Sequence, residues 1–232
     1  MILKNYDRKL IPELPKLVRT NVGGNRHYET PNGSYPSITS VLSIRNKEGI
    51  LEWRKKVGNE EANRITKRAT TRGTQFHSLL EKYFLNEIDD FSSFSGAALA
   101  KNPAVWFLFC EAVQILEKKV GDIYCIEDYL YSDEYGVAGA VDMIAEYEGI
   151  TSVVDFKTSN KEKKEEWIEN YFIQGTAYAK MFTERTNIPC DQLVIFIMPD
   201  NGIPQIFVKS VDDYIPQLIT AIEDFKIYQK KT

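Results

Sequence analysis

The 232-residue chain has little of what several common functional sites require. Its only cysteines, Cys110, Cys125 and Cys190, are too far apart for a C-x-x-C pair. A zinc site, an iron–sulfur cluster and a disulfide framework are therefore not expected, and the cysteines are interpreted as small apolar core residues. The sequence also lacks a G-x-x-x-x-G-K-[ST] loop, so no ATP site of that type is predicted.

Long apolar segments are also missing. No run approaches the roughly 18 apolar residues that cross a bilayer, so no membrane partner is expected. The first residues mix charges with prolines and match neither a secretory signal nor a mitochondrial targeting peptide. We therefore expect a cytoplasmic protein. The length and the 43% hydrophobic composition predict one globular domain over residues 1–232.

Positive charge is scarce overall but is concentrated at one end. The net charge is −4, yet residues 1–75 hold 15 basic and 7 acidic side chains, against 14 and 26 in the remainder. A basic segment next to an acidic one can hold a polyanion near acidic metal ligands. A charged, solvated surface with no partner is the alternative interpretation.

The pattern of apolar and turn-forming residues divides the chain into three parts. Residues 1–35 are rich in Pro, Gly and Asn and predict an extended N-terminal arm, and residues 36–120 predict a mainly helical part in which Ser37 caps a helix. Residues 121–232 predict a sheet with helices, in which three strands form a meander. The expected helices are 47–69, 75–85, 103–119, 163–186 and 211–230, with a connection at 86–102, and the expected strands are 124–132, 136–147, 151–157, 193–198 and 205–209. The fold class is therefore α/β, a mixed sheet flanked by helices.

Two acidic residues on neighbouring strands of the predicted meander form the candidate site. Asp142 lies on the second strand, and Asp155-Phe156-Lys157 ends the third, where Asp155 and Lys157 project to the same face. Two adjacent carboxylates repel unless a cation or a proton lies between them. Their oxygens, with the Phe156 carbonyl, suit Mg²⁺ or Mn²⁺, and a nearby lysine can orient a water and stabilise charge on a phosphate. A surface ion pair between Asp155 and Lys157 is the alternative.

Two helical segments add candidate residues. Gln174 and Tyr178 share one face of the helix that follows the third strand, where they could contact a phosphate or a base. An exposed glutamine and a core tyrosine are the alternatives. Arg72, Gly73 and Thr74 are expected at a helix N-terminus, which attracts phosphate, with His77 one turn later as a metal ligand or phosphate contact. A histidine with a structural role is the alternative there.

Taken together, these motifs resemble the RecB-type nucleases of the PD-(D/E)xK superfamily. The resemblance covers roughly residues 35–200. It extends to mitochondrial genome maintenance exonucleases and their phage and bacterial relatives, whose N-terminal segments are similar to residues 35–42 and 72–77. The matching residues are His77, Gly139 to Asp142, Asp155-Phe156-Lys157-Thr158, and Gln174 to Tyr178.

The resemblance implies a restriction-endonuclease-like αβββαβ core and a Mg²⁺- or Mn²⁺-dependent exonuclease. Its catalytic residues would be Asp142, Asp155, Lys157, His77 and Gln174. Ser37, Thr39 and the segment near Arg72 would contact the DNA backbone, and Glu127, expected on the first strand, would be a supporting acid. Because no ATP motor is present, the expected partner is DNA that is already single-stranded or has free ends, with a separate helicase or replication protein beside it.

Two other functions stay open at this point. A structure-specific or restriction-like endonuclease could use the same core, and it would open single-stranded circles that an exonuclease leaves intact. A DNA-binding module that keeps the fold without activity is the alternative from another class. It would bind DNA and cleave nothing with any divalent metal.

Overall fold

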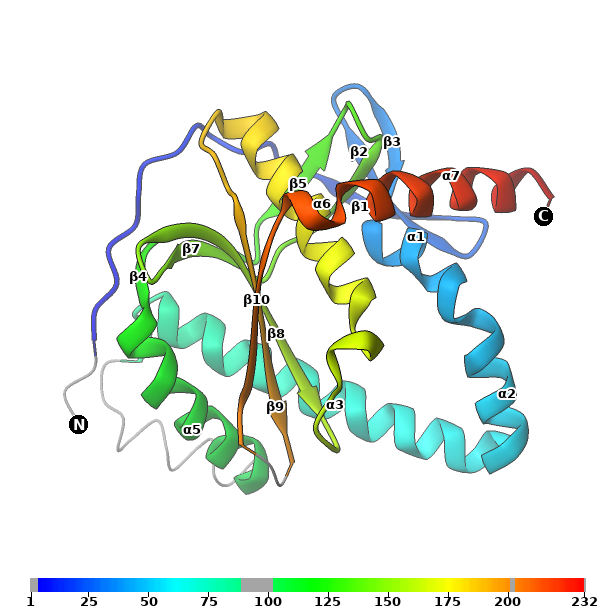
Figure 1. Ribbon diagram of the computed structural model, residues 1–232, viewed down its shortest axis with the longest axis horizontal. Coiled ribbons are helices and arrows are strands. Elements are labelled where there is room, and N and C mark those ends of the chain that lie inside the picture. The colour runs from blue at the N-terminus through cyan, green and yellow to red at the C-terminus, as the bar shows by residue number, and fades with distance from the viewer. Residues whose placement is uncertain (1–3, 89–101, 201–202, 232) are drawn as a thin grey trace.

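Five strands form a mixed sheet at the centre of the computed structural model, which describes residues 4–88, 102–200 and 203–231 (Figure 1). Strands β8 and β9 are parallel, and the other neighbouring pairs are antiparallel. The predicted α/β class, a mixed sheet flanked by helices, is confirmed. In spatial order the strands are β10 (Gln205–Ser210), β9 (Gln192–Pro199), β8 (Ile150–Ser159), β7 (Met143–Tyr147) and β4 (Val120–Ile126).

Helices cover both faces of this sheet. Alternate residues of β8 point to opposite faces, so that Val154 and Phe156 pack with α3 and α5 while Val153 packs with α6 and α7. No helix in the described parts of the chain has both the length and the apolar character needed to cross a bilayer. The four helices are α3 (Asn59–Phe84), α5 (Pro103–Lys119), α6 (Glu169–Thr186) and α7 (Ile215–Lys231).

The helical part begins as predicted, but one of its boundaries differs. Ser37 caps α1 (Ile38–Ser43), its Oγ accepting a hydrogen bond from the Ser40 amide at 3.0 Å. A 3₁₀ turn (Ile44–Asn46) leads into α2 (Lys47–Val57), and Gly58, with φ of 84°, separates α2 from α3. Because α3 then runs unbroken to Phe84, the helix N-terminus expected at Arg72 to Thr74 is wrong.

Two further helix boundaries were predicted less accurately. The helix expected over 103–119 is confirmed, whereas most of the expected connection, residues 89–101, lies outside the described residues. The helices expected from 163 and 211 begin later, at Glu169 and Ile215. Each is preceded by a 3₁₀ turn, at Glu165–Trp167 and Asp212–Tyr214.

The N-terminal arm contains a sheet that the sequence analysis missed. The expectation of an extended arm over residues 1–35 is wrong for its second half, where β1 (Val18–Val22), β2 (Asn25–Thr30) and β3 (Gly33–Pro36) form an antiparallel sheet. Gly23 and Gly24 make the first turn, with φ of 58° and 81°. Two consecutive residues with positive φ are typical of a two-residue hairpin turn, which glycine forms without steric cost.

The predicted three-strand meander is interrupted by a second small sheet. Strands β5 (Tyr129–Ser132) and β6 (Val137–Ala140) pair with each other between β4 and β7. At the two breaks, the Glu127 amide donates to the Asp142 carbonyl at 3.0 Å, and the Val141 amide donates to the Asp128 carbonyl at 3.0 Å. The expectation that Glu127 and Asp142 lie within strands is therefore wrong. Both lie where a long strand divides into two shorter ones.

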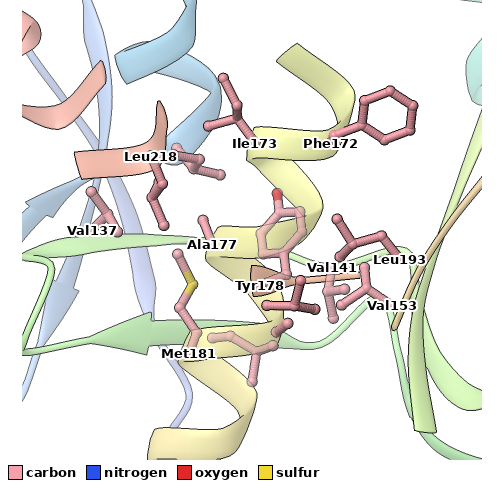
Figure 2. Close-up of a cluster of buried hydrophobic side chains, with 14 of the residues drawn as sticks. Val137, Val141, Val153, Phe172, Ile173, Ala177, Tyr178, Met181, Leu193 and Leu218 are labelled. Carbon is pink, nitrogen blue, oxygen red and sulfur yellow. The ribbon is translucent and has the colours of Figure 1, made fainter. Parts of the chain in front are cut away.

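Helix α6 packs closely over the β6–β7 junction and the central strands. Figure 2 shows Tyr178 of α6 beside Val141, Val153 and Leu193, and its side chain is only 2% exposed. Gly139 of β6 makes room for it, because a Cβ at that position would lie 2.8 Å from Tyr178 Cε1. The glycine and the tyrosine of the sequence motifs are thus in direct contact.

Replacing Gly139 tests this contact. We expect Gly139→Ala to lower the free energy of unfolding by about 2 kcal/mol, because the buried ring must shift to admit the methyl group. Gly73→Ala is the matched control, since its Cβ would meet only Thr158 Oγ1 at 3.8 Å. Because Gly73 lies within α3, Gly73→Ala should raise the free energy of unfolding by about 1 kcal/mol. Urea unfolding of both variants measures the difference, and equal stabilities would contradict the contact.

Candidate metal centre and cleft

The candidate site lies beside β8 at the point where β7 begins, at Met143. Pairing of β7 with β8 stops at Met143 opposite Val154, whereas β8 continues along β9 as far as Ser159. Beyond Val154, a side chain takes the place of the missing strand: the Phe156 amide donates to Asp142 Oδ2 at 2.9 Å. Because the N–H and C=O of a strand residue point to the same side, the Phe156 carbonyl also faces this opening.

Three potential metal ligands converge at this opening. His77 comes from the middle of α3, Glu127 from the break between β4 and β5, and Asp142 from the break between β6 and β7. One ligand atom from each lies within 4.8 Å of the others. Glu127 adopts a φ of 50°, a left-handed conformation that is costly for a residue with a Cβ and is often found at functional sites.

Asp155 and Lys157 lie beside this group on β8, as their spacing predicted. The Lys157 ammonium forms an ion pair with Asp155 and also contacts the Phe156 carbonyl, at 3.4 Å. Asp155 is 1% exposed, and apart from the lysine neither of its carboxylate oxygens has a hydrogen-bond donor among the described residues. The alternative of a surface ion pair is therefore wrong, because the aspartate is buried.

The charges in this region are strongly coupled. Burial raises the pKa of Asp155 to about 6, with Lys157 opposing this shift and Asp142 adding to it. Burial also acts to raise the pKa of Asp142, but the positive charges of His77 and Lys157 outweigh it and hold that pKa below its usual range. Burial acts to lower the pKa of His77, whereas Asp142 and Glu127 raise it to about 10. The pKa of Lys157 is likewise raised by the carboxylates, against the effect of its own burial.

A divalent cation fits this donor set. The positive charges of His77 and Lys157 offset the converging carboxylates, and apart from Lys157 no described residue donates a hydrogen bond to the oxygens of Asp155. Buried carboxylates without donors are stabilised when they coordinate a cation. His77, Glu127 and Asp142 can supply a nitrogen and oxygens to one ion. The sequence-based set paired Asp142 and His77 with Asp155, and it gave Glu127 only a supporting position.

A cleft of about 490 Å³ opens onto the three ligands. It contains most of the residues that the sequence analysis selected, and several that it did not. The selected residues that line it are Ser37, Thr39, Gly73, Thr74, His77, Glu127, Asp142, Gln174 and Tyr178, and the additional ones that matter here are Arg26, Tyr28, Ser78 and Glu81. Glu81 lies one turn after His77, a spacing visible in the sequence. Arg26 was missed because its segment was interpreted as an irregular arm.

Gln174 and Tyr178 act together at the wall of the cleft. Gln174 Nε2 donates to the Tyr178 hydroxyl at 3.4 Å, and burial raises the pKa of that hydroxyl above its usual range. Since the tyrosine ring is enclosed by apolar side chains, core packing describes most of its environment. Contact of either residue with DNA stays a prediction.

Arg72 is engaged within the protein. Its guanidinium donates to Thr158 Oγ1 at 3.1 Å and Asn160 Oδ1 at 2.9 Å, and it forms an ion pair with Asp200. These contacts attach the middle of α3 to the ends of β8 and β9. Ser37 is also buried and occupied by its capping bonds, whereas Thr39 and Thr74 expose their side chains at the cleft. Contact of these four residues, and of Gly73, with the DNA backbone stays a prediction.

Comparison with known proteins gives one similar sequence. No family model matches the chain. The human protein "Mitochondrial genome maintenance exonuclease 1" is 27% identical over 180 residues, which are 69% of this chain and 48% of that protein. The chain therefore spans about half the length of this curated relative.

A crystal structure is among the solved structures that match the chain. It belongs to a protein of Eubacterium rectale named "Putative exonuclease", with 17% identity and a TM-score of 0.44 over 66% of this chain and 64% of that chain. At this score, no conclusion about the site rests on the resemblance.

The contacts of Arg72 predict a structural role that can be measured. We expect Arg72→Met to lower the free energy of unfolding by about 2 kcal/mol, because the bonds of the buried guanidinium to Thr158, Asn160 and Asp200 are lost. Arg64→Met is the matched control on the same helix, since Arg64 is exposed and pairs only with Glu61. Chemical denaturation should show no measurable change for Arg64→Met. Equal effects of the two substitutions would contradict the structural role.

Metal binding should be visible as a gain in stability. With Mn²⁺ at about 100 times its Kd, the folded chain should gain about 2.7 kcal/mol, which raises Tm. Glu127→Gln and Asp142→Asn should each lose most of this gain, because each removes a carboxylate from the converging group. Asp224→Asn, on the exposed side of α7, should keep the full gain. The same Mn²⁺ shift in all four proteins would exclude this metal site.

Proposed function

We propose that this chain is a metal-dependent DNA exonuclease of the RecB-like PD-(D/E)xK type, acting on single-stranded DNA or flaps with free ends. The convergence of His77, Glu127 and Asp142 next to the buried Asp155–Lys157 pair is the observation that carries the proposal. Its similarity over 180 residues to a human protein named as an exonuclease supports the choice of reaction.

The proposed cofactor is Mg²⁺ or Mn²⁺, because carboxylate and carbonyl oxygens are the ligands that these ions prefer. Asp142, Glu127 and His77 would hold the ion, with Asp155 and the Phe156 carbonyl on its β8 side. When bound, such an ion supplies a Lewis acid for the phosphate and lowers the pKa of a water.

The protein's own groups then have separate tasks. The neighbouring carboxylates of Asp155 and Asp142 raise the pKa of Lys157, which favours its charged ammonium form. It stabilises the negative charge that grows on the phosphate in the transition state. Asp155 holds the ammonium in place through the ion pair, and Gln174, fixed by its bond to Tyr178, orients the strand or a water.

End-labelled linear and circular single-stranded DNA tests the proposal. With Mg²⁺ or Mn²⁺, the linear strand should be degraded and the circle should remain intact, and EDTA should stop the reaction. Lys157→Met should lower kcat by at least about a hundredfold, because a charge directed at the transition state is lost. Asp142→Asn should do the same by weakening metal binding.

Two controls make the outcome specific. Lys118→Met and Asp224→Asn remove the same charges from exposed positions on α5 and α7, and both should retain full activity. Opened circles would identify an endonuclease instead. DNA binding without cleavage in either metal would leave a silent binding module and would overturn the proposed reaction.

A further inference from the structure

A second hollow adjoins the candidate cleft. It has a volume of about 470 Å³ and lies between the β1–β2 hairpin and α1. Arg26 and Thr39 line both the cleft and this hollow, so the two lie next to each other. We call the second hollow the hairpin groove; it is lined by Arg19, Thr20, Asn21, Gly24, Asn25, Arg26, Thr39, Ser40 and Ser43.

The side chains of the hairpin groove are suited to a polyanion. The groove has two arginines, two asparagine amides and several hydroxyls, and none of the described acidic residues lines it. In the β1–β2 register, Arg26 lies opposite Asn21 and Arg19 opposite Tyr28, which places these side chains on one face of the hairpin. Glu29 lies opposite Val18, on the other face, where it accepts hydrogen bonds from Thr20 and Ser34.

Both arginines of the hairpin groove reach the protein surface. Arg19 and Arg26 are exposed, and neither forms an ion pair with a described acidic residue. The groove also lacks an aromatic ring on which a base could stack. Its chemistry is therefore that of phosphate contact, which positions a strand without reading its sequence.

We propose that the hairpin groove is a second phosphate-binding subsite, which holds the backbone of the same DNA strand whose scissile phosphate lies at the candidate metal centre. This inference rests on the proposed nuclease function and names the part of the substrate that this surface binds. In this proposal the cleft contains the residues that would hold the ion, and the neighbouring hairpin groove binds phosphates beyond the cleavage position. The subsite makes affinity depend on strand length and not on base sequence.

Arg19 provides the test, because it lines the hairpin groove and not the cleft. Binding of labelled oligodeoxythymidylate of roughly ten nucleotides, within the range of single-strand site sizes, is measured as a function of salt. A Lys157→Met background prevents degradation of the strand. Adding Arg19→Ala should raise Kd several-fold and reduce the slope of log K against log salt by about 0.7, the value for one lost phosphate contact.

The controls distinguish the effects of side-chain charge, protein folding and strand length on DNA binding. Arg19→Lys should recover most of the salt slope, and Lys118→Ala, which removes one charge from α5, should leave both Kd and slope unchanged. A strand too short to reach from the metal centre to the groove should show a smaller penalty from Arg19→Ala. Circular dichroism establishes that the variants are folded.

The outcomes distinguish the two proposals. An unchanged slope with Arg19→Ala, or an equal loss with Lys118→Ala, overturns the subsite even if the wild-type chain degrades the strand. A reduced slope supports the subsite. Absence of cleavage by the wild-type chain in both metals overturns the nuclease function, and the binding measurement does not depend on cleavage.

Discussion

Mutual repulsion between the carboxylates of Asp142 and Asp155 is the constraint on which the candidate site depends. Asp142 and Asp155 lie near the same opening in the sheet, and the charge of Asp142 contributes to the raised pKa of Asp155. The chain offsets this negative charge with Lys157 and His77, whose own pKa values are raised in response. Carboxylates that repel one another in this way are the groups that a bound cation would stabilise.

The geometry of the opening comes from unequal strand lengths. Strand β8 has ten residues and stays paired with β9 along its second half. Strand β7 has only five residues, and its pairing with β8 stops at Val154 of β8. The resulting unpaired edge of β8 is where Asp142 bonds the Phe156 amide. A metal centre in this position needs no long loop, because the ends of strands and one helix supply all of its residues.

The features that depend on local periodicity could be predicted from the sequence. The alternation in β8 correctly placed Asp155 and Lys157 together, and Ser37 was correctly identified as a helix cap. The errors share a different cause. The breaks at Glu127 and Asp142 depend on main-chain hydrogen bonds between segments about 15 residues apart, which no local pattern records.

Long-range contacts also explain what was missed elsewhere. Arg72 resembled a phosphate ligand because its partners, Thr158, Asn160 and Asp200, are more than 80 residues away in the sequence. Arg26 received no role because only the paired strands reveal its face of the hairpin. The paired glycines at positions 23 and 24 could have indicated that hairpin, since they are the preferred residues of such turns.

The continuity of α3 has a mechanical consequence. The helix has 26 residues and a length of about 39 Å, and its second half is fixed to the sheet through Arg72 and the core around Phe76. Its first half extends away from the sheet next to α2 (Figure 1). Because a regular helix resists bending, a macromolecule that pushed on this outer half would tilt the helix as a rod pivoting near Arg72. The imidazole of His77 lies just beyond that pivot, so force applied to the outer half of α3 would be transmitted to one of the candidate metal ligands.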